Sequence, residues 1–241
     1  MSLLSKSFLK KDEIDSKMKL PLKKESYTVL KKIQDVSDFT KEEVWTYIAP
    51  LFIDKYMWMT NGYTPRVRVK LFHTTKYIYL YYHVPEDRIT IKYTQFGSDV
   101  YKDSCVEFFI NPFPESTDEF FNIEFNALGV VLIGIGKPGR GNKRYFFKEN
   151  EINRIEVISS IKKPLTGYHG KDFWELYSKI PKSIFENSYS KEFTDKACIG
   201  NFYKCGDETE FEHYGAWSEI VNPTPNFHLA KYFGELLFIN K

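Results

Sequence analysis

The chain has 241 residues, of which 42% are hydrophobic and 17% are aromatic, including 21 Phe and 17 Tyr. This composition can build one large β domain or two small ones, and it excludes a disordered chain. The formal net charge is only +2, from 34 basic and 32 acidic residues, so we expect no nucleic-acid partner. No run approaches the roughly 18 apolar residues of a transmembrane helix, so no membrane span is predicted.

The N-terminal segment differs from the rest of the chain. Residues 1–25 are polar and rich in lysine, and we predict a Lys-rich arm that precedes a single domain over residues 26–241. A solvated tail is the simplest interpretation of the arm, and contact with a membrane surface or a polyanion is the alternative. Residues 1–9 contain no apolar core of signal-peptide length. The compartment is therefore left unknown: periplasmic or extracellular if a leader has been removed, and cytoplasmic otherwise.

The predicted elements begin with a short helix or turn. Thr40 and Glu43 have the spacing of a capping box, and the residues after them would carry Trp45 toward the core. From Pro65 onward, apolar and polar residues alternate in short runs, as they do on half-buried strands. A helical turn is predicted at residues 181–186. The predicted strands cover residues 26–34, 67–71, 78–84, 89–93, 104–111, 119–127, 130–135, 154–162, 172–180, 197–205 and 233–239.

About ten short strands joined by polar, Gly- and Pro-containing turns predict an all-β fold. We expect an antiparallel β-sandwich, jelly-roll or immunoglobulin-like, with long loops and one or two short helices. The long loops are residues 136–150 and 206–232. The glycines of residues 134–141 suggest a phosphate loop, but the pattern G-x-x-x-x-G-K-S/T is absent and no helix follows. We therefore interpret this region as a mobile hairpin loop.

Two predicted strands carry polar side chains on one face. Because side chains on a strand alternate between its faces, Glu107 lies opposite the apolar residues that flank it in the run 105–111. Polar side chains share one face of the run 120–126 in the same way: Asn122, Glu124 and Asn126. Glu and Asn are poor strand formers, so their repetition on one face needs a reason. One interpretation is that this polar face binds a ligand rich in hydroxyl groups. The other, which we weight equally, is that it is a solvated sheet face.

Metal and disulfide chemistry receive little support. Five histidines are scattered without tight ligand spacing, so a histidine metal site is not expected. Three cysteines at irregular spacing argue against a disulfide framework. One bridge is conceivable, but buried thiols are expected in the strands around Cys105 and Cys205. We expect no cofactor, and we keep a structural calcium ion as an alternative. Its donors would be Asp99 and Asp103, or Asp207, Glu208 and Glu210.

The carboxylates Glu107 and Glu124 could lie close together on neighbouring strands, as paired carboxylates do in glycosidases. Since nothing in the sequence marks an apolar pocket that would raise the pKa of a catalytic acid, structural or ligand hydrogen bonding is preferred. Loop aromatics could cover the faces of a sugar ring while amides and carboxylates bind its rim. Trp217 could instead anchor its loop in the core. The loop candidates for ligand binding are Tyr101, Trp217, Asn226 and Phe227.

Several short motifs occur in the order typical of one family. They are Glu43-Val-Trp45, Thr64-Pro-Arg-Val-Arg-Val69, Lys76-Tyr-Ile-Tyr-Leu80, Val84-Pro-Glu-Asp87, Asp103-Ser-Cys-Val-Glu-Phe-Phe109, Phe121-Asn-Ile-Glu-Phe-Asn126, Gly200-Asn-Phe-Tyr-Lys-Cys205, Trp217-Ser218 and Phe233-Gly-Glu-Leu236. Through them, roughly residues 40–241 resemble the family 9 carbohydrate-binding modules. The resemblance is strongest to the family-9-like group of bacterial glycan-utilisation proteins.

The resemblance implies a β-sandwich that binds the ends of sugar chains in a slot between two aromatic rings, sometimes with structural calcium. Two positions depart from the family pattern. Val100 stands where the first ring is expected, with Tyr101 one position away, and Glu124 replaces an arginine. The residues to which the resemblance assigns ligand binding are Glu107, Asn126, Tyr203 and Phe227.

We therefore expect a non-catalytic carbohydrate-binding protein that acts in glycan uptake or degradation, with other glycan-degrading proteins as candidate partners. Two alternatives stay open. One is a glycoside-processing enzyme that uses Glu107 and Glu124, and the other is a protein-interaction β-sandwich, since a fold does not imply a function. The predicted ligand-binding residues are Tyr101, Glu107, Glu124, Asn126, Tyr203, Trp217, Asn226 and Phe227.

Overall fold

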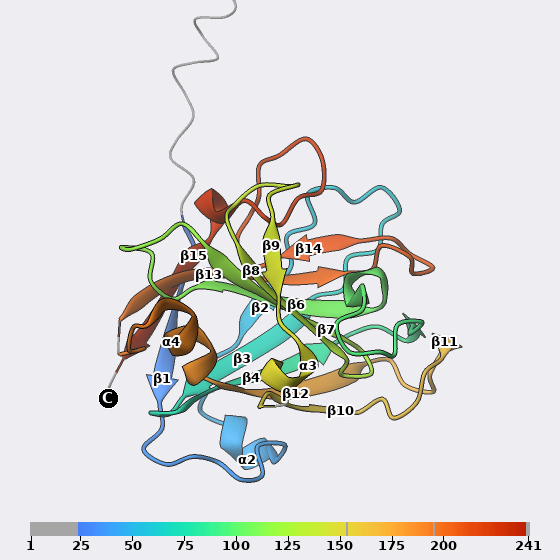
Figure 1. Ribbon diagram of the computed structural model, residues 1–241. Helices are drawn as coiled ribbons and strands as arrows, with labels where there is room; N and C mark the ends of the chain where they lie inside the picture. Colours follow the sequence, from blue (N-terminus) through green and yellow to red (C-terminus); the bar gives the residue numbers. More distant parts are fainter. Residues whose placement is uncertain (1–23, 153, 195, 240–241) are drawn as a thin grey trace, which may run out of the picture.

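The computed structural model of the protein describes residues 24–152, 154–194 and 196–239 (Figure 1). The predicted Lys-rich arm thus lies outside the described residues except for Lys24 and Glu25. The helices are α2 (Glu42–Trp45), α3 (Glu149–Ile152) and α4 (Ser183–Tyr189), with 3-10 turns η1 (Val100–Lys102) and η2 (Ala230–Tyr232). The strands are β1 (Ser26–Lys31), β2 (Leu51–Ile53), β3 (Val67–His73), β4 (Tyr77–Val84), β5 (Arg88–Thr90), β6 (Cys105–Asn111), β7 (Phe120–Asn126), β8 (Val131–Gly136), β9 (Arg144–Phe146), β10 (Glu156–Ser159), β11 (Thr166–Tyr168), β12 (Trp174–Pro181), β13 (Ala197–Cys205), β14 (Tyr214–Ala216) and β15 (Gly234–Ile239).

Most of the described strands belong to one 13-stranded sheet, whose main path is β10-β12-β4-β3-β1-β15-β13-β6-β7-β8-β9. The other two strands are β14, which pairs with β13, and β2, which pairs with β3. The sheet folds over, so that β3, β4 and β12 form one layer and β6, β7 and β8 lie in the other (Figure 1). Core side chains from both layers form one cluster, which is the arrangement of a sandwich. The predicted all-β sandwich is confirmed. Its pairing is antiparallel except at β1, which runs parallel to both β3 and β15.

Alternation along β6 and β7 sorts their side chains between the core and the outer face of the layer. Val106 and Phe108 of β6 and Phe121 of β7 are fully buried between the layers, and each such side chain stabilises the fold by about 1.5–3 kcal/mol. The polar residues occupy the opposite face, as predicted. They are not solvated, however, because Glu107 is 2% exposed and Glu124 is 5% exposed. A solvated sheet face was therefore the wrong alternative.

The short helix α2 is not capped in the predicted way. Lys41 occupies the N-cap position without a side-chain hydrogen bond. Both the backbone N–H and the hydroxyl of Thr40 donate instead to Asp38 Oδ1, at 3.2 and 2.7 Å. Trp45 is buried as predicted, and its indole N–H donates to the carbonyl oxygen of Phe39 at 2.8 Å. Through this cluster, α2 and the preceding loop cover aromatic side chains of β3 and β4.

Several elements were absent from the prediction. The strands β2, β9, β11 and β14 each have three residues, which is too short for alternation to be visible. The described residues form three short helices, where one or two were predicted. The hairpin predicted around residues 134–141 is present, since β8 and β9 pair across residues 137–143. The long loop predicted at residues 136–150 is shorter, because it contains β9 and α3 begins at Glu149. Within the described ranges, no helix combines the length and apolar character needed to cross a membrane.

Candidate functional site

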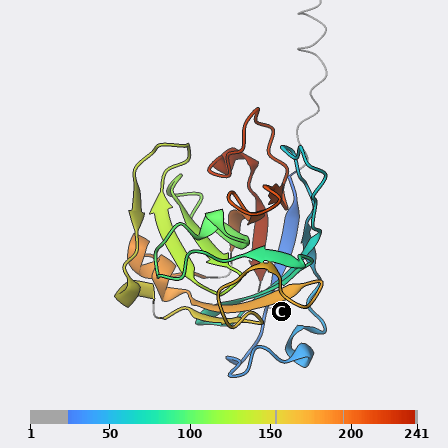
Figure 2. The same cartoon turned by 90° about the vertical axis from the view of Figure 1, so that its right-hand side faces the viewer.

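A cavity of about 730 Å³ lies on the outer face of the layer that contains β6 and β7. Its floor is formed by side chains of β6, β7, β8 and the end of β13. Its walls come from loops around residues 97–101, 139–142, 207–214 and 225–228. Figure 2 shows that the segments near residues 140 and 225 rise on the same side of the sheet. Loops that are distant in the sequence therefore enclose the polar face of two adjacent strands.

Two carboxylates form the centre of the floor. Glu107 of β6 and Glu124 of β7 are directly opposite each other in the antiparallel register. The Cys205 thiol donates to Glu107 Oε1 at 2.9 Å, and the Asn122 amide donates to Glu124 Oε1 at 2.7 Å. The second oxygen of each carboxylate is buried without a hydrogen-bond partner among the described residues. The floor therefore contains two buried carboxyl oxygens without partners.

Burial raises the pKa of both carboxyl groups. For Glu107 desolvation is the largest cause, and the neighbouring Glu124 raises its pKa further, to well above the usual range. Desolvation raises the pKa of Glu124 to about 7, against the opposing effects of the Asn122 hydrogen bond and the Arg144 guanidinium. The pair therefore retains protons near neutral pH and can both donate and accept hydrogen bonds. The sequence had not revealed this low-dielectric environment.

Arg144 of β9 brings a guanidinium to the cavity. Its Nε donates to Asn122 Oδ1 at 2.8 Å, and its Nη2 donates to the carbonyl oxygen of Phe120 at 2.9 Å. The guanidinium also lies 4.4 Å from the centre of the Phe120 ring. Since Asn122 donates to Glu124, the three side chains form a hydrogen-bonded chain along the floor. Glu124 stands where the resemblance expects an arginine. Arg144, from β9, brings a positive guanidinium to the same cavity.

The segment 225–228 forms a wall with an aromatic ring and an imidazole. The Phe227 ring stacks on Tyr203, with centroids 3.9 Å apart and planes 5° apart, and the Tyr203 hydroxyl donates to the Phe227 carbonyl oxygen. Asn226 Oδ1 accepts the backbone N–H of His228 at 3.0 Å. Desolvation, aided by Arg144, lowers the pKa of His228 to about 4, so its imidazole is neutral at pH 7. Its Nδ1 is buried and has no partner among the described residues.

The structure brings most of the predicted ligand-binding residues together and separates three from them. Tyr203 is fully buried beneath the Phe227 ring, so it supports the wall of the cavity. Trp217 is buried in the core, where its ring packs against Phe202. Neither of these side chains lines the cavity, and Asn126 does not line it either. The predicted residues that do line it are Tyr101, Glu107, Glu124, Asn226 and Phe227.

Asn126 and Asp103 shape the backbone beside the cavity. The Asn126 amide donates to Asp103 Oδ2 at 3.0 Å and to the carbonyl oxygen of Tyr93 at 2.7 Å, while its Oδ1 accepts two backbone N–H groups. Asp103 accepts the backbone N–H groups of Lys92 and Tyr93. The hydrogen-bonding capacity of Asn126 is therefore used within the protein. Calcium binding by the loop carboxylates stays a prediction.

Several lining residues were missed by sequence reasoning because they lie in loops or in a three-residue strand, where no period marks a face. Their positions follow from which loops cover the sheet, and that depends on contacts between residues far apart in the chain. They are Arg140, Arg144, Phe146, Glu212 and His228.

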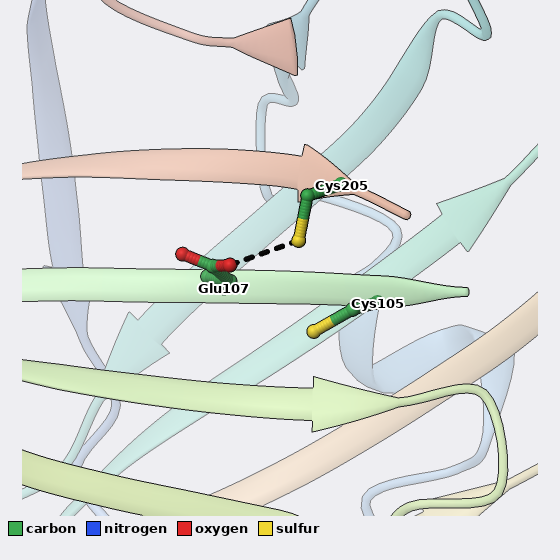
Figure 3. A group of neighbouring side chains, drawn as sticks. All are labelled: Cys105, Glu107 and Cys205. Carbon is green, nitrogen blue, oxygen red and sulfur yellow. Dashed lines mark hydrogen bonds between the residues drawn. The ribbon is translucent and has the colours of Figure 1, made fainter. Parts of the chain in front are cut away.

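Two thiols lie next to the carboxylate floor. Cys105 of β6 and Cys205 of β13 are directly opposite each other, beside Glu107 (Figure 3). All three cysteines are free and buried, which was predicted for Cys105 and Cys205, and burial raises the pKa of the Cys105 thiol to about 12. The two sulfur atoms and a Glu107 oxygen lie within 4.8 Å of one another. In the part of the chain that the structure describes, no other three His, Cys, Asp or Glu side chains gather this closely.

The sequence profile of carbohydrate-binding family 9 matches residues 43–238. The chain belongs to this family. A proposed carbohydrate-binding protein from Bacteroides uniformis ATCC 8492 is 30% identical, and its structure superposes with a TM-score of 0.81 over 90% of this chain and 100% of that chain. Membership of carbohydrate-binding family 9 confirms the resemblance predicted from the motifs.

Two solved structures of a family 9 module from Caldicellulosiruptor kristjanssonii share the fold. The complex with glucose is 13% identical, with a TM-score of 0.59, and covers 90% of this chain and 97% of that chain. The complex with cellotriose is 12% identical, with a TM-score of 0.58, and covers 90% and 95%. Among curated proteins, none matches this family 9 chain.

Proposed function

We propose that this family 9 chain binds the end of a carbohydrate chain, without catalysis, in the cavity over β6 and β7. One observation carries the proposal: Glu107 Oε2, Glu124 Oε2 and His228 Nδ1 are all buried without a partner among the described residues, and all three residues line this cavity. An unpaired buried polar group costs about 1–3 kcal/mol. A ligand that brings hydroxyl groups to these atoms recovers that free energy.

The remaining surface of the cavity fits a sugar ring. The side chains of Tyr101, Tyr214 and Phe227 supply apolar surface for the C–H faces of the ring. Sugar hydroxyls donate and accept, which matches a carboxyl pair that retains protons and a neutral imidazole. Family membership and the glucose and cellotriose complexes of the Caldicellulosiruptor module support this ligand class. We expect affinities on the order of micromolar to millimolar, because few groups bind a well-hydrated ligand.

The arrangement of the carboxylates favours binding over glycoside hydrolysis. A glycosidase places its two carboxyl groups on either side of the scissile bond. Glu107 and Glu124 project from the same face of two paired strands, so they approach a ligand from one side. They are therefore placed to hold hydroxyl groups. Glycan uptake or degradation, alongside other glycan-degrading proteins, is the proposed setting.

The test is a glycan-array screen of the purified chain with and without calcium, followed by titration of each hit. We expect saccharide ends to be bound without hydrolysis. Glu107→Gln keeps the shape of the side chain and replaces the carboxyl group by an amide. We expect it to weaken binding by about tenfold, equivalent to one strong hydrogen bond. The exposed Glu192→Gln is the matched control. If the folded chain binds none of the plant, algal and host glycans, the proposal is overturned. Release of cleaved products would favour the enzyme alternative.

A further inference from the structure

Two thiols and a carboxylate gather on neighbouring strands β6 and β13, at the floor of the cavity (Figure 3). Cys105 and Cys205 are cross-strand neighbours, and Glu107 lies two residues beyond Cys105 on the same face of β6. Cys205 Sγ is 2.9 Å from Glu107 Oε1. The three side chains are at most 2% exposed, so the surrounding structure holds them in place.

Within the described ranges, the carboxyl groups of the floor also have no cation paired directly with them. Among the described residues, no lysine or arginine forms a salt bridge with Glu107 or Glu124. Lys204 precedes Cys205 in β13, but its ammonium lies on the other face, 3.2 Å from Glu86. A buried carboxylate needs a proton, a cation or a set of donors. Neighbouring sulfur atoms favour a thiophilic cation over calcium.

We propose that Cys105, Cys205 and Glu107 bind a thiophilic divalent ion such as Zn²⁺. In a tetrahedral zinc site the Zn–S bonds are about 2.3 Å and the Zn–O bonds about 2.0–2.2 Å, which places the donor atoms roughly 3.5–3.8 Å apart. The three donor atoms already lie within 4.8 Å of one another, so small side-chain rotations close the site. Binding displaces the two thiol protons and the proton that Glu107 retains to solvent, and leaves two thiolates and a carboxylate around the ion.

The cavity offers the route of entry. Glu107 and Cys205 line the cavity, whereas Cys105 beside them does not. A three-ligand zinc site keeps a fourth position for water or another oxygen ligand, and here that position would face the cavity. Glu107 would bind the ion through one oxygen, while its unpaired Oε2 stays available to a ligand. The ion would then fix the carboxylate that the cavity presents.

The experiment is a titration of the reduced, oxygen-free protein with Co²⁺, whose visible and near-ultraviolet spectrum reports thiolate ligation in a tetrahedral site. We expect one Co²⁺ per chain with thiolate charge-transfer bands, displaced by Zn²⁺. Cys105→Ser and Cys205→Ser should each weaken Co²⁺ binding by at least about tenfold, because each removes a direct ligand. Cys198→Ser, the third buried thiol, lies outside the group and should bind Co²⁺ like the wild type.

A reduced wild type without thiolate–cobalt bands would overturn the proposal, and so would equal bands in the Cys105→Ser/Cys205→Ser double variant. If the serine variants do not fold, the wild type still decides the matter: Zn²⁺ in excess should raise its Tm, since the ion binds the folded state, and an unchanged Tm contradicts the site. No sugar enters this experiment, so its result is independent of whether the cavity binds carbohydrate.

Discussion

At the scale of single residues, Glu107 and Glu124 give the cavity its chemistry. Both are buried on the floor, and desolvation is the largest cause of the raised pKa of each. A carboxyl group with a raised pKa in the folded state keeps a proton that the unfolded chain releases. Such a group favours the unfolded state increasingly as the pH rises from the unfolded pKa to the folded one. The binding floor therefore costs stability at neutral pH.

Glu124→Gln should reveal this cost. Across the window from pH 4.5, the usual pKa of the side chain, to about 7, its raised value, the wild type should lose unfolding free energy that the variant keeps. Relative to the wild type, the variant should gain on the order of 2 kcal/mol between pH 4 and pH 7. Urea unfolding over a pH series measures the difference, with Glu192→Gln as the exposed control. A difference that is constant with pH would contradict the buried, proton-retaining carboxyl group.

At the scale of elements, a buried ion pair joins β13 to Glu86 in the turn after β4, and Glu86 also contacts β12 and the turn before β6. Lys204 Nζ of β13 lies 3.2 Å from Glu86 Oε2, and both side chains are almost completely buried. Glu86 also accepts the Trp174 indole N–H at 2.8 Å and the Ser104 hydroxyl at 3.0 Å. These hydrogen bonds satisfy the carboxylate, so the pair links three elements at one edge of the core.

Glu86→Gln should be strongly destabilising, because it leaves the Lys204 ammonium buried without its counter-charge. We expect the free energy of unfolding in urea to fall by about 3–5 kcal/mol. The matched control is Glu210→Gln, which breaks the half-exposed pair between Glu210 and Arg88 and should cost about 1 kcal/mol or less. A loss in Glu86→Gln as small as that in the control would show that the buried pair does not hold these elements together.

Local periodicity explains which parts of the site could be predicted. Alternation on β6 and β7 is a property of each strand alone, so the shared face of Glu107 and Glu124 was visible in the sequence. The same alternation grouped Asn126 with them, and the resemblance to family 9 modules added Tyr203. In the structure, Asp103 holds the Asn126 amide and the Phe227 ring covers Tyr203. Periodicity identifies the face of a strand but not what covers that face.

The walls of the cavity depend on contacts that no local pattern records. Arg144 reaches Asn122 because β9 pairs with β8, yet β9 has only three residues. The approach is close: a Cβ atom at Gly134 would lie 2.8 Å from Asn122 Oδ1 and 3.1 Å from the Phe146 ring. The glycine was visible in the sequence, but the reason for it was not. His228 was likewise an isolated histidine until the fold placed its loop over the sheet.

At the scale of the whole molecule, the folded-over sheet places the residues that stabilise the fold and the residues that line the cavity on opposite faces of one layer. The apolar faces of the two layers make the core, while the outer face of one layer is free to carry the cavity. Core residues and cavity residues alternate along the same strands, so the scaffold positions the polar groups rigidly. Substitutions in the cavity walls should therefore alter binding more than they alter folding.

The central claim is that carbohydrate binds against Phe227 above the carboxylate floor. The most direct test is calorimetric titration of the wild type and Phe227→Ala with the saccharide that the glycan array identifies. We predict that Phe227→Ala keeps its folded spectrum and loses affinity by about tenfold or more, because the sugar loses a stacking ring. Tyr168→Ala, which removes an exposed ring outside the cavity, should bind like the wild type. An unchanged affinity in folded Phe227→Ala would place the carbohydrate elsewhere and contradict this account.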